Sequence, residues 1–237
     1  MASVAQIAWS SVAKKVITSV TGFALMAYII VHLLGNLTLF IGPAVFNEYA
    51  FFLEELFHGW FVIVAEIGLV TIFLFHIVAG ITVAWTDKRR ARPERYAVVR
   101  DVGKPSRKTL SSRSMILTGI VLLIFVPVHV WMFKFGSHTM IERAAEPDLK
   151  NLYETTVSAF KNPLIVAAYV LAMVLLGLHL RHGFWSSFQS LGWANERTLP
   201  FLTTAAVIFA VIMAAGYVIL PVYAYFALDP AAGMGGH

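Results

Sequence analysis

The sequence contains no cysteine and few charged residues. Zero cysteines among 237 residues exclude disulfides, thiolate-bound iron–sulfur clusters and thioether-attached haem in this chain. Only 13% of the residues are charged, about half the fraction of a typical soluble domain. So few charges cannot cover the surface of a soluble globule of this length. In addition, 59% of the residues are hydrophobic. The composition therefore excludes a soluble domain.

The hydrophobic residues form five long blocks. A membrane-spanning helix needs about 20 predominantly apolar residues. The first block is too long for a signal peptide and lacks its cleavage pattern. Glycines and prolines inside the blocks are tolerated because neighbouring spans satisfy the backbone. The sequence predicts an all-α fold with a single membrane domain over 1–237, and spans I to V at about 16–41, 59–86, 112–136, 163–189 and 199–226.

The distribution of charge predicts how these spans are oriented. Lys and Arg accumulate on the cytoplasmic side of membrane proteins. The loop 42–58 has three Glu and neither Lys nor Arg, whereas 87–113 has ten basic residues against three acidic ones. No basic residue follows Arg197. We therefore expect a cytoplasmic N-terminus and an outer C-terminus. The basic segment is expected to contact lipid headgroups or a cytoplasmic partner, not nucleic acid.

Four of the eight histidines lie deep in spans I to IV, one in each. Polar side chains inside the hydrocarbon are costly and usually functional, although a single one could be a helix–helix hydrogen-bond donor. A helical rise of about 1.5 Å per residue sorts them into an outer pair, His32 and His129, and an inner pair, His76 and His179. The two levels are roughly 10 Å apart by the same rise. Two stacked bis-imidazole haems would need such pairs on facing helices.

An internal repeat supports this pairing. A Thr-Gly dipeptide followed after nine residues by His occurs in spans I and III, and His followed after three residues by Gly occurs in spans II and IV. The first pattern is Thr21–His32 and Thr118–His129; the second is His76–Gly80 and His179–Gly183. Spans I–II and III–IV are thus predicted to be two copies of one hairpin. The small residues would let a flat macrocycle approach the backbone, or let helices pack closely.

The residues alone also allow two other kinds of site, a metal site without haem and a proton relay. A zinc or copper site would gather three or four ligands at one level, whereas these histidines divide between two levels. A proton relay would normally include acids within the membrane, and only Glu66 lies well inside a span. The pattern therefore favours haem.

Four segments carry a family resemblance: SVTGFALMAYIIVH (19–32), TIFLFHIVAGI (71–81), LTGIVLLIFVPVHVW (117–131) and HLRHGFWSSFQSLGW (179–193). Together with the spacing of five spans, they make the chain resemble the dihaem cytochrome b (b558-type) anchor of succinate dehydrogenases and fumarate reductases. The type it resembles has five helices in one polypeptide. The four histidines in register carry this resemblance, which extends over nearly the whole chain.

The resemblance implies a respiratory electron-transport protein, the membrane subunit of a succinate:menaquinone oxidoreductase of the tricarboxylic acid cycle. It implies two haems b, with His32 and His129 on the outer iron and His76 and His179 on the inner iron. The implied partners are a flavoprotein subunit, where dicarboxylate chemistry occurs, and an iron–sulfur subunit, both on the cytoplasmic side of a prokaryotic inner membrane. The alternative is a dihaem anchor of a hydrogenase or formate dehydrogenase.

Further residues are candidates for binding haem propionates. They are Ser19, Arg113, Arg181 and His182. Each has a structural alternative: a serine can bond its own helix backbone, and arginines near span ends commonly extend toward the headgroups. His182 could also compete with His179 as ligand, or be an interface-level histidine, but the family pattern favours His179.

The resemblance implies that menaquinone or another quinone reacts near the outer haem. Quinone chemistry moves two protons with two electrons, so a carboxylate within hydrogen-bond reach is useful. The candidates on the outer side are Glu54, Glu55 and Glu66. Glu54 and Glu55 could equally be solvated loop acids.

Overall fold

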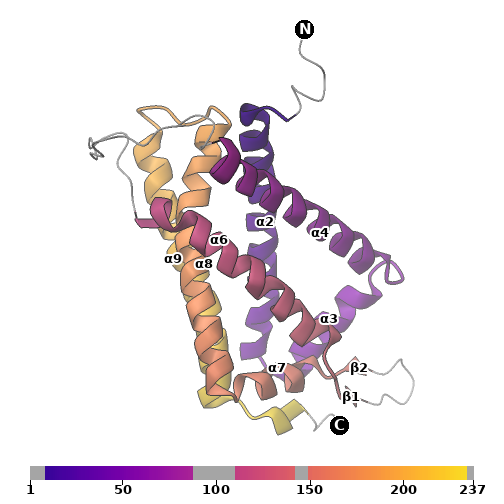
Figure 1. Cartoon of the computed structure of the whole chain (residues 1–237). Coiled ribbons are helices and arrows are strands. Elements are labelled where there is room, and N and C mark those ends of the chain that lie inside the picture. Colours follow the sequence, from indigo (N-terminus) through magenta and orange to yellow (C-terminus); the bar gives the residue numbers. More distant parts are fainter. Residues whose placement is uncertain (1–8, 88–109, 142–148, 234–237) are drawn as a thin grey trace. The chain divides into compact units, whose positions relative to one another are not determined.

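The computed structural model describes residues 9–87, 110–141 and 149–233. Within these residues, five helices are long and apolar enough to cross a membrane (Figure 1). Three of them change to a short helix of another type at their C-terminal end. The helices are α2 (Ser11–Asn36) with η1 (Leu37–Phe40), α4 (Trp60–Ile81) with η2 (Thr82–Asp87), α6 (Leu110–Val130) with η3 (Trp131–Phe135), α8 (Pro163–Ser190) and α9 (Leu199–Ala227). The five predicted spans and the all-α membrane class are confirmed.

Two of the long helices contain proline. Pro127 lies inside α6 and Pro221 inside α9. Proline removes one backbone hydrogen bond and crowds the preceding turn, yet both helices continue past it, as membrane helices can. After Pro127, α6 changes at Trp131 into the wider π-helical turn η3.

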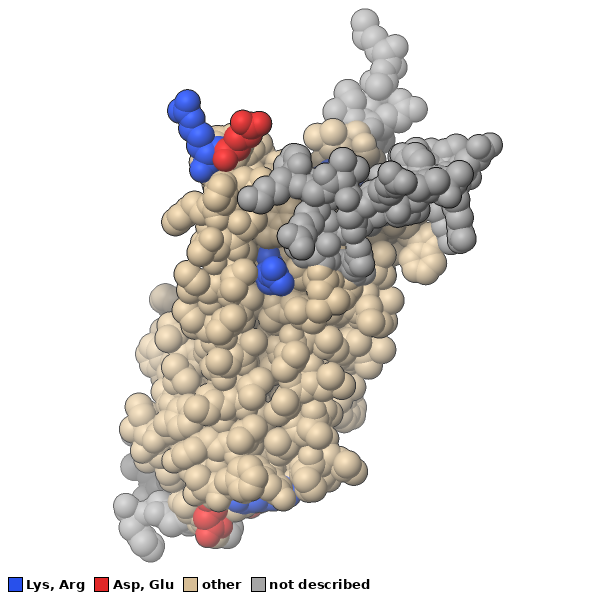
Figure 2. All heavy atoms as spheres, turned by 90° about the vertical axis from the view of Figure 1, so that its left-hand side faces the viewer, with Lys and Arg blue, Asp and Glu red and all other residues tan. Residues whose placement is uncertain are grey.

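The described surface is apolar. Figure 2 shows a face on which Lys, Arg, Asp and Glu are few and other residues cover nearly all of the described area. Large hydrophobic side chains are exposed on the long helices, among them Leu164 at 78%, Phe201 at 72% and Phe226 at 78%. In water such exposure would be costly, at about 25 cal/mol per Å² of apolar surface. The hydrocarbon core of a bilayer removes this cost.

The prediction that 42–58 form a loop was wrong, because this segment contains helix α3 (Pro43–Glu55). Gly42 adopts a φ of 143°, which turns the chain after η1, and Pro43 occupies the first helical turn, where its missing N–H is not needed. One face of α3 buries Phe46 and Asn47. Other short elements are β1 (Met140–Ile141), β2 (Leu149–Lys150), α7 (Leu152–Phe160) and η4 (Pro230–Gly233).

The chain divides into two compact units. The first comprises Met1–Ala27, Leu69–Gly119 and Leu178–Ala210, and the second comprises Tyr28–Gly68, Ile120–Gly177 and Val211–His237. The first unit contains His76 and His179, and the second contains His32 and His129. The single domain over 1–237 stays a prediction, as does most of the basic segment 87–113, because 88–109 lie outside the described residues.

A buried asparagine pair holds the short elements of the second unit together. The Asn47 amide donates to Asn151 Oδ1 at 3.2 Å, and the Tyr153 N–H donates to Asn47 Oδ1 at 2.8 Å. Asn151 also caps α7 by accepting from the Glu154 N–H at 3.1 Å, and donates to the Gly233 carbonyl at 3.0 Å. Both asparagines are at most 2% exposed. The pair thus joins α3, α7 and η4.

Candidate cofactor-binding histidine pairs and an outer carboxylate

The inner pair brings His76 of α4 against His179 of α8 within the first unit. The centres of the two imidazole rings are 6.4 Å apart, with an angle of 61° between the rings. A metal–imidazole bond is about 2 Å long, so two rings on opposite sides of one metal ion have centres about 6 Å apart. Ring pairs without a metal also occur at about 4.5–7 Å. The separation therefore fits a shared metal, and the hydrogen bonds decide which nitrogen would bind it.

Both inner rings form hydrogen bonds through Nδ1. The Thr18 carbonyl oxygen and the Thr21 hydroxyl oxygen each lie 3.2 Å from Nδ1 of His76, and Thr118 Oγ1 lies 3.1 Å from Nδ1 of His179. A carbonyl can only accept, so the bond to Thr18 requires a proton on Nδ1. The tautomer that results presents the lone pair of Nε2 to a metal.

The two threonine hydroxyls direct their own protons elsewhere. Thr21 donates to the carbonyl of Ile17 at 2.6 Å. Thr118 reaches the carbonyls of Ser114 and Met115 at 3.1 and 3.0 Å. Each hydroxyl is therefore available to histidine as an acceptor, which favours the same tautomer for the His179 ring as for the His76 ring.

The glycine after each threonine lies against the same histidine ring that the threonine contacts. A Cβ built on Gly22 would lie 3.3 Å from Cε1 of His76, and one on Gly119 would lie 3.5 Å from Cε1 of His179. The sequence pattern Thr-Gly thus has a structural meaning that the sequence analysis missed, although the repeat itself was the signal for it. The contact recurs from α2 to α4 and from α6 to α8, which supports the proposed internal repeat.

Gly80 and Gly183, one turn beyond the inner histidines, have more room. A Cβ on Gly80 would meet no atom within 4 Å among the contacts the structure describes, and one on Gly183 would meet only the tip of Met115 at 4.0 Å. Of the two uses predicted for these glycines, close helix packing does not describe Gly80, and the approach of a flat macrocycle stays a prediction.

The outer pair brings His32 of α2 against His129 of α6 within the second unit. The ring centres lie 5.9 Å apart at 86°. Nδ1 of His129 is 3.0 Å from the hydroxyl of Tyr169, a contact that no sequence pattern predicted. Tyr28 stacks on His32 with ring centres 5.5 Å apart. The Asn36 amide donates to the His32 carbonyl at 2.7 Å and approaches Nε2 of that ring at 3.4 Å, so binding a metal through this nitrogen requires the amide to turn away.

The donor sets fit haem better than a bare transition-metal ion. Within 9–87, 110–141 and 149–233, no group of three or more His, Cys, Asp or Glu side chains could hold a metal ion. A haem iron needs only two protein ligands because the macrocycle supplies four nitrogens. Pairs of histidines are therefore sufficient for haem, whereas structural zinc uses four protein ligands.

The predicted propionate residues have different surroundings. The buried Ser19 hydroxyl donates to the Lys15 carbonyl of its own helix at 2.9 Å, which is the structural alternative for that residue. The His182 ring packs edge-on against Trp185 at 5.3 Å. Arg181 is half-buried on α8. The Arg113 side chain lies outside the described part of the chain, so its role stays a prediction, as do those of His182 and Arg181.

The three predicted quinone-site carboxylates are not alike. Glu54 forms an ion pair with Lys150 at 3.1 Å, and both side chains are about half exposed. Glu55 is exposed at the end of α3. Glu66 lies inside the span formed by α4 and forms an ion pair with Lys134 of η3. The solvated-acid alternative therefore describes Glu54 and Glu55, but not Glu66.

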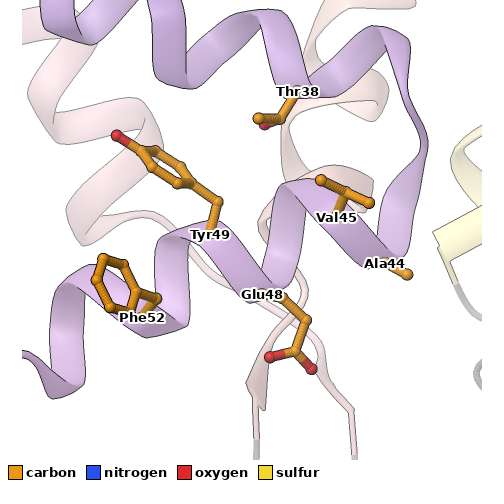
Figure 3. A pocket seen from close by; sticks show the side chains of 6 residues that line it. All are labelled: Thr38, Ala44, Val45, Glu48, Tyr49 and Phe52. Atoms are coloured by element: carbon orange, nitrogen blue, oxygen red, sulfur yellow. The ribbon is translucent and has the colours of Figure 1, made fainter.

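A pocket of about 420 Å³ lies beside α3 in the second unit, and the sequence analysis did not foresee it (Figure 3). Ligand pockets generally measure about 300–1,000 Å³. Its lining comprises Thr38, Ala44, Val45, Glu48, Tyr49 and Phe52. The Tyr49 ring packs on Gly35, where a Cβ would come within 2.5 Å of the ring. Tyr28 interacts electrostatically with both Tyr49 and Glu66.

The fold and the site define a multi-pass helical membrane protein whose spans carry two pairs of facing imidazoles. Among curated proteins, the chain is similar to the succinate dehydrogenase cytochrome b558 subunit of Bacillus subtilis. The two are 26% identical over 160 residues, which cover 67% of this chain and 69% of that one. No family model matches the chain. No solved structure matches it.

Proposed function

We propose that this chain is the membrane-anchor cytochrome b subunit of a succinate dehydrogenase complex. It transfers electrons between an iron–sulfur partner subunit and a membrane quinone through two haems b. The observation that carries the proposal is the inner pair, in which Nδ1 of each ring is engaged in a hydrogen bond, so that Nε2 is the nitrogen that would bind a metal. The similarity to the Bacillus subtilis subunit supports the same function.

The residues that would hold the two haems follow from the pairs. His76 and His179 would hold one, and His32 and His129 the other. Haem b, when bound, supplies reversible one-electron transfer at iron. Thr21 donates its proton to the helix backbone, so it accepts from the His76 ring, fixes its orientation and raises the basicity of Nε2. The apolar helix faces around the pairs exclude water from the irons.

The partners follow from topology. Five spans place residues before the first and after the last on opposite sides of the bilayer, and the basic excess in 87–113 assigns that loop to the cytoplasm. A flavoprotein and an iron–sulfur subunit would dock on this side of a prokaryotic inner membrane, and succinate chemistry would belong to them. The inner pair would be the one that exchanges electrons with the iron–sulfur subunit.

The quinone would react in the second unit, where the outer pair lies. Reduction of a quinone consumes two electrons and two protons, so the site needs a group that exchanges protons. Glu66 is the favoured carboxylate because it lies within a span, whereas Glu54 and Glu55 lie on α3. The pocket beside Tyr49 offers a largely apolar space for a quinone ring.

Purification of the chain from its native membrane tests this function. We expect two haems b per chain by pyridine haemochrome, together with a covalently or tightly bound flavin and an iron–sulfur subunit. A preparation without haem would contradict the proposal. A nickel- or molybdenum-containing partner would replace it with a hydrogenase or formate dehydrogenase anchor.

A further inference from the structure

An ion pair joins two membrane-spanning helices on the side of the second unit. Lys134, in η3, donates a hydrogen bond to Oε1 of Glu66, in α4. The side chains are 42% and 40% exposed on the protein surface, and both residues lie within the segments that are apolar enough to span a membrane. Glu66 lies six residues after the beginning of its span at Trp60, and Lys134 lies one residue before the end of its span at Phe135, so the pair lies near one end of both spans.

Charge within a membrane span is costly unless it is compensated. The cost is about 2.5–3.5 kcal/mol at the centre of a membrane helix by insertion measurements, whereas a lysine near a span end can extend toward the headgroups. Removing one member of an ion pair in an apolar environment leaves the other charge uncompensated, and such a group takes up or loses a proton instead. Loss of Lys134 would therefore leave the Glu66 carboxylate without its ion-pair partner.

Among the described residues, Lys134 forms the ion pair that balances the charge of Glu66. Tyr28 on α2, whose hydroxyl is uncharged, is a second titratable group near Glu66. Lys134 itself lies 5.4 Å from the centre of the Phe135 ring, and its carbonyl oxygen lies 3.4 Å from Nε2 of His138. The arrangement thus links one acid and one base across α4 and η3.

We propose that Lys134 is a positioning residue that stabilises Glu66 as the proton-accepting carboxylate of quinol oxidation. The proposal rests on the function proposed above. In each half of the reaction, one quinol O–H bond would break, its proton would go to the Glu66 carboxylate, and one electron would go to the haem that His32 and His129 would hold. Glu66 then releases the proton to water. Two such cycles convert quinol to quinone, and the reverse sequence describes quinone reduction.

The test measures quinol-driven fumarate reduction by the purified complex, with a water-soluble dimethylnaphthoquinol as substrate. Lys134→Met should lower kcat about tenfold at pH 7, and the rate should recover about one pH unit or more higher, since one unit corresponds to a tenfold change. KM for the quinol should stay unchanged. Lys134→Arg should keep the wild-type pH profile, because it keeps the charge. Lys150→Met, which breaks the exposed pair with Glu54, is the matched control and should also keep it.

A second variant separates positioning from a loss of folding. Glu66→Gln should be slow at every pH, and adding Lys134→Met should change it no further, because the lysine would act only through this carboxylate. The double variant has no uncompensated charge, so it assembles even where Lys134→Met does not. An unshifted pH profile in Lys134→Met, or a further loss in the double variant, would overturn the proposal.

A control assay distinguishes failure of the Lys134 proposal from failure of the proposed function. Fumarate reduction by reduced viologen dye bypasses the quinone, so it should be unchanged in all variants, and each should retain two haems. A wild-type complex that lacks haem or quinol activity would instead refute the proposed function itself.

Discussion

The hydroxyl of Thr118 lies 3.1 Å from Nδ1 of His179, and its own proton is directed to a carbonyl of the preceding helical turn. The threonine is thus an acceptor for the imidazole N–H. Thr21 stands in the same relation to His76 across the other hairpin. One dipeptide repeat therefore produces two equivalent histidine environments in the first unit.

Replacing Thr118 by valine should weaken the inner haem site. Valine keeps the shape but cannot accept from Nδ1–H, and loss of such an outer contact typically costs about 10–100-fold in metal affinity. The ring also becomes a poorer electron donor, so the midpoint potential of the inner haem should rise. Redox titration and haem content after gel filtration measure both effects. Thr204→Val is the control, since Thr204 bonds only to its own helix at Pro200; equal behaviour of the two variants would contradict this role.

The glycines of the repeat should differ in tolerance. A Cβ on Gly22 would lie 3.3 Å from the His76 ring, which is crowded, whereas one on Gly119 would lie 3.5 Å from the His179 ring, an ordinary contact. We expect Gly22→Ala to alter the electron paramagnetic resonance signal of the inner haem and Gly119→Ala to leave it nearly unchanged. Valine at either position should remove the signal. An altered signal in Gly119→Ala alone would be inconsistent with this geometry.

The buried asparagine pair should dominate the stability of the second unit. Asn151→Ala leaves the Glu154 N–H, the Gly233 carbonyl and an Asn47 amide hydrogen without their partner. Each unsatisfied buried group costs about 1–3 kcal/mol, so the loss should be about 3 kcal/mol or more. The exposed Asn162, which caps α8 through the Leu164 N–H, provides the control Asn162→Ala, expected to cost about 1 kcal/mol. Thermal unfolding of the detergent-solubilised protein compares them.

The absence of cysteine makes the topology directly testable. Single cysteines introduced at the exposed residues Glu196, between α8 and α9, and Ala231, after α9, should lie on opposite sides of the membrane. A membrane-impermeant maleimide should label Ala231→Cys in spheroplasts and Glu196→Cys only in inside-out vesicles. The reversed pattern would show that the charge distribution was misread.

Much of the fold could be predicted because a bilayer demands long apolar segments that satisfy their own backbone. All five spans follow from this demand alone. Helix α3 could not be foreseen, because its stability comes from burying Phe46 and Asn47 against elements distant in the sequence. The pairing of His76 with His179 followed from depth and is matched by the structure.

The contacts of the histidine rings were harder to predict. The Thr-Gly repeat was visible in the sequence, yet its contact with the histidine of the next span depends on the rotation of each helix, which periodicity in a wholly apolar span does not fix. For the same reason, Tyr169 beside His129 and Lys134 beside Glu66 had no signal. In an apolar span, the sequence predicts the depth of a residue in the membrane well but predicts the rotation of the helix about its axis poorly.

The haem content of single histidine variants tests the central claim most directly. His76→Ala and His179→Ala should each leave one haem per chain, with the same spectrum, and His32→Ala and His129→Ala should each leave the other haem. His58→Ala and His138→Ala, outside the two pairs, should retain two. Two haems in all four pair variants, or loss of different haems by the two members of one pair, would contradict the account.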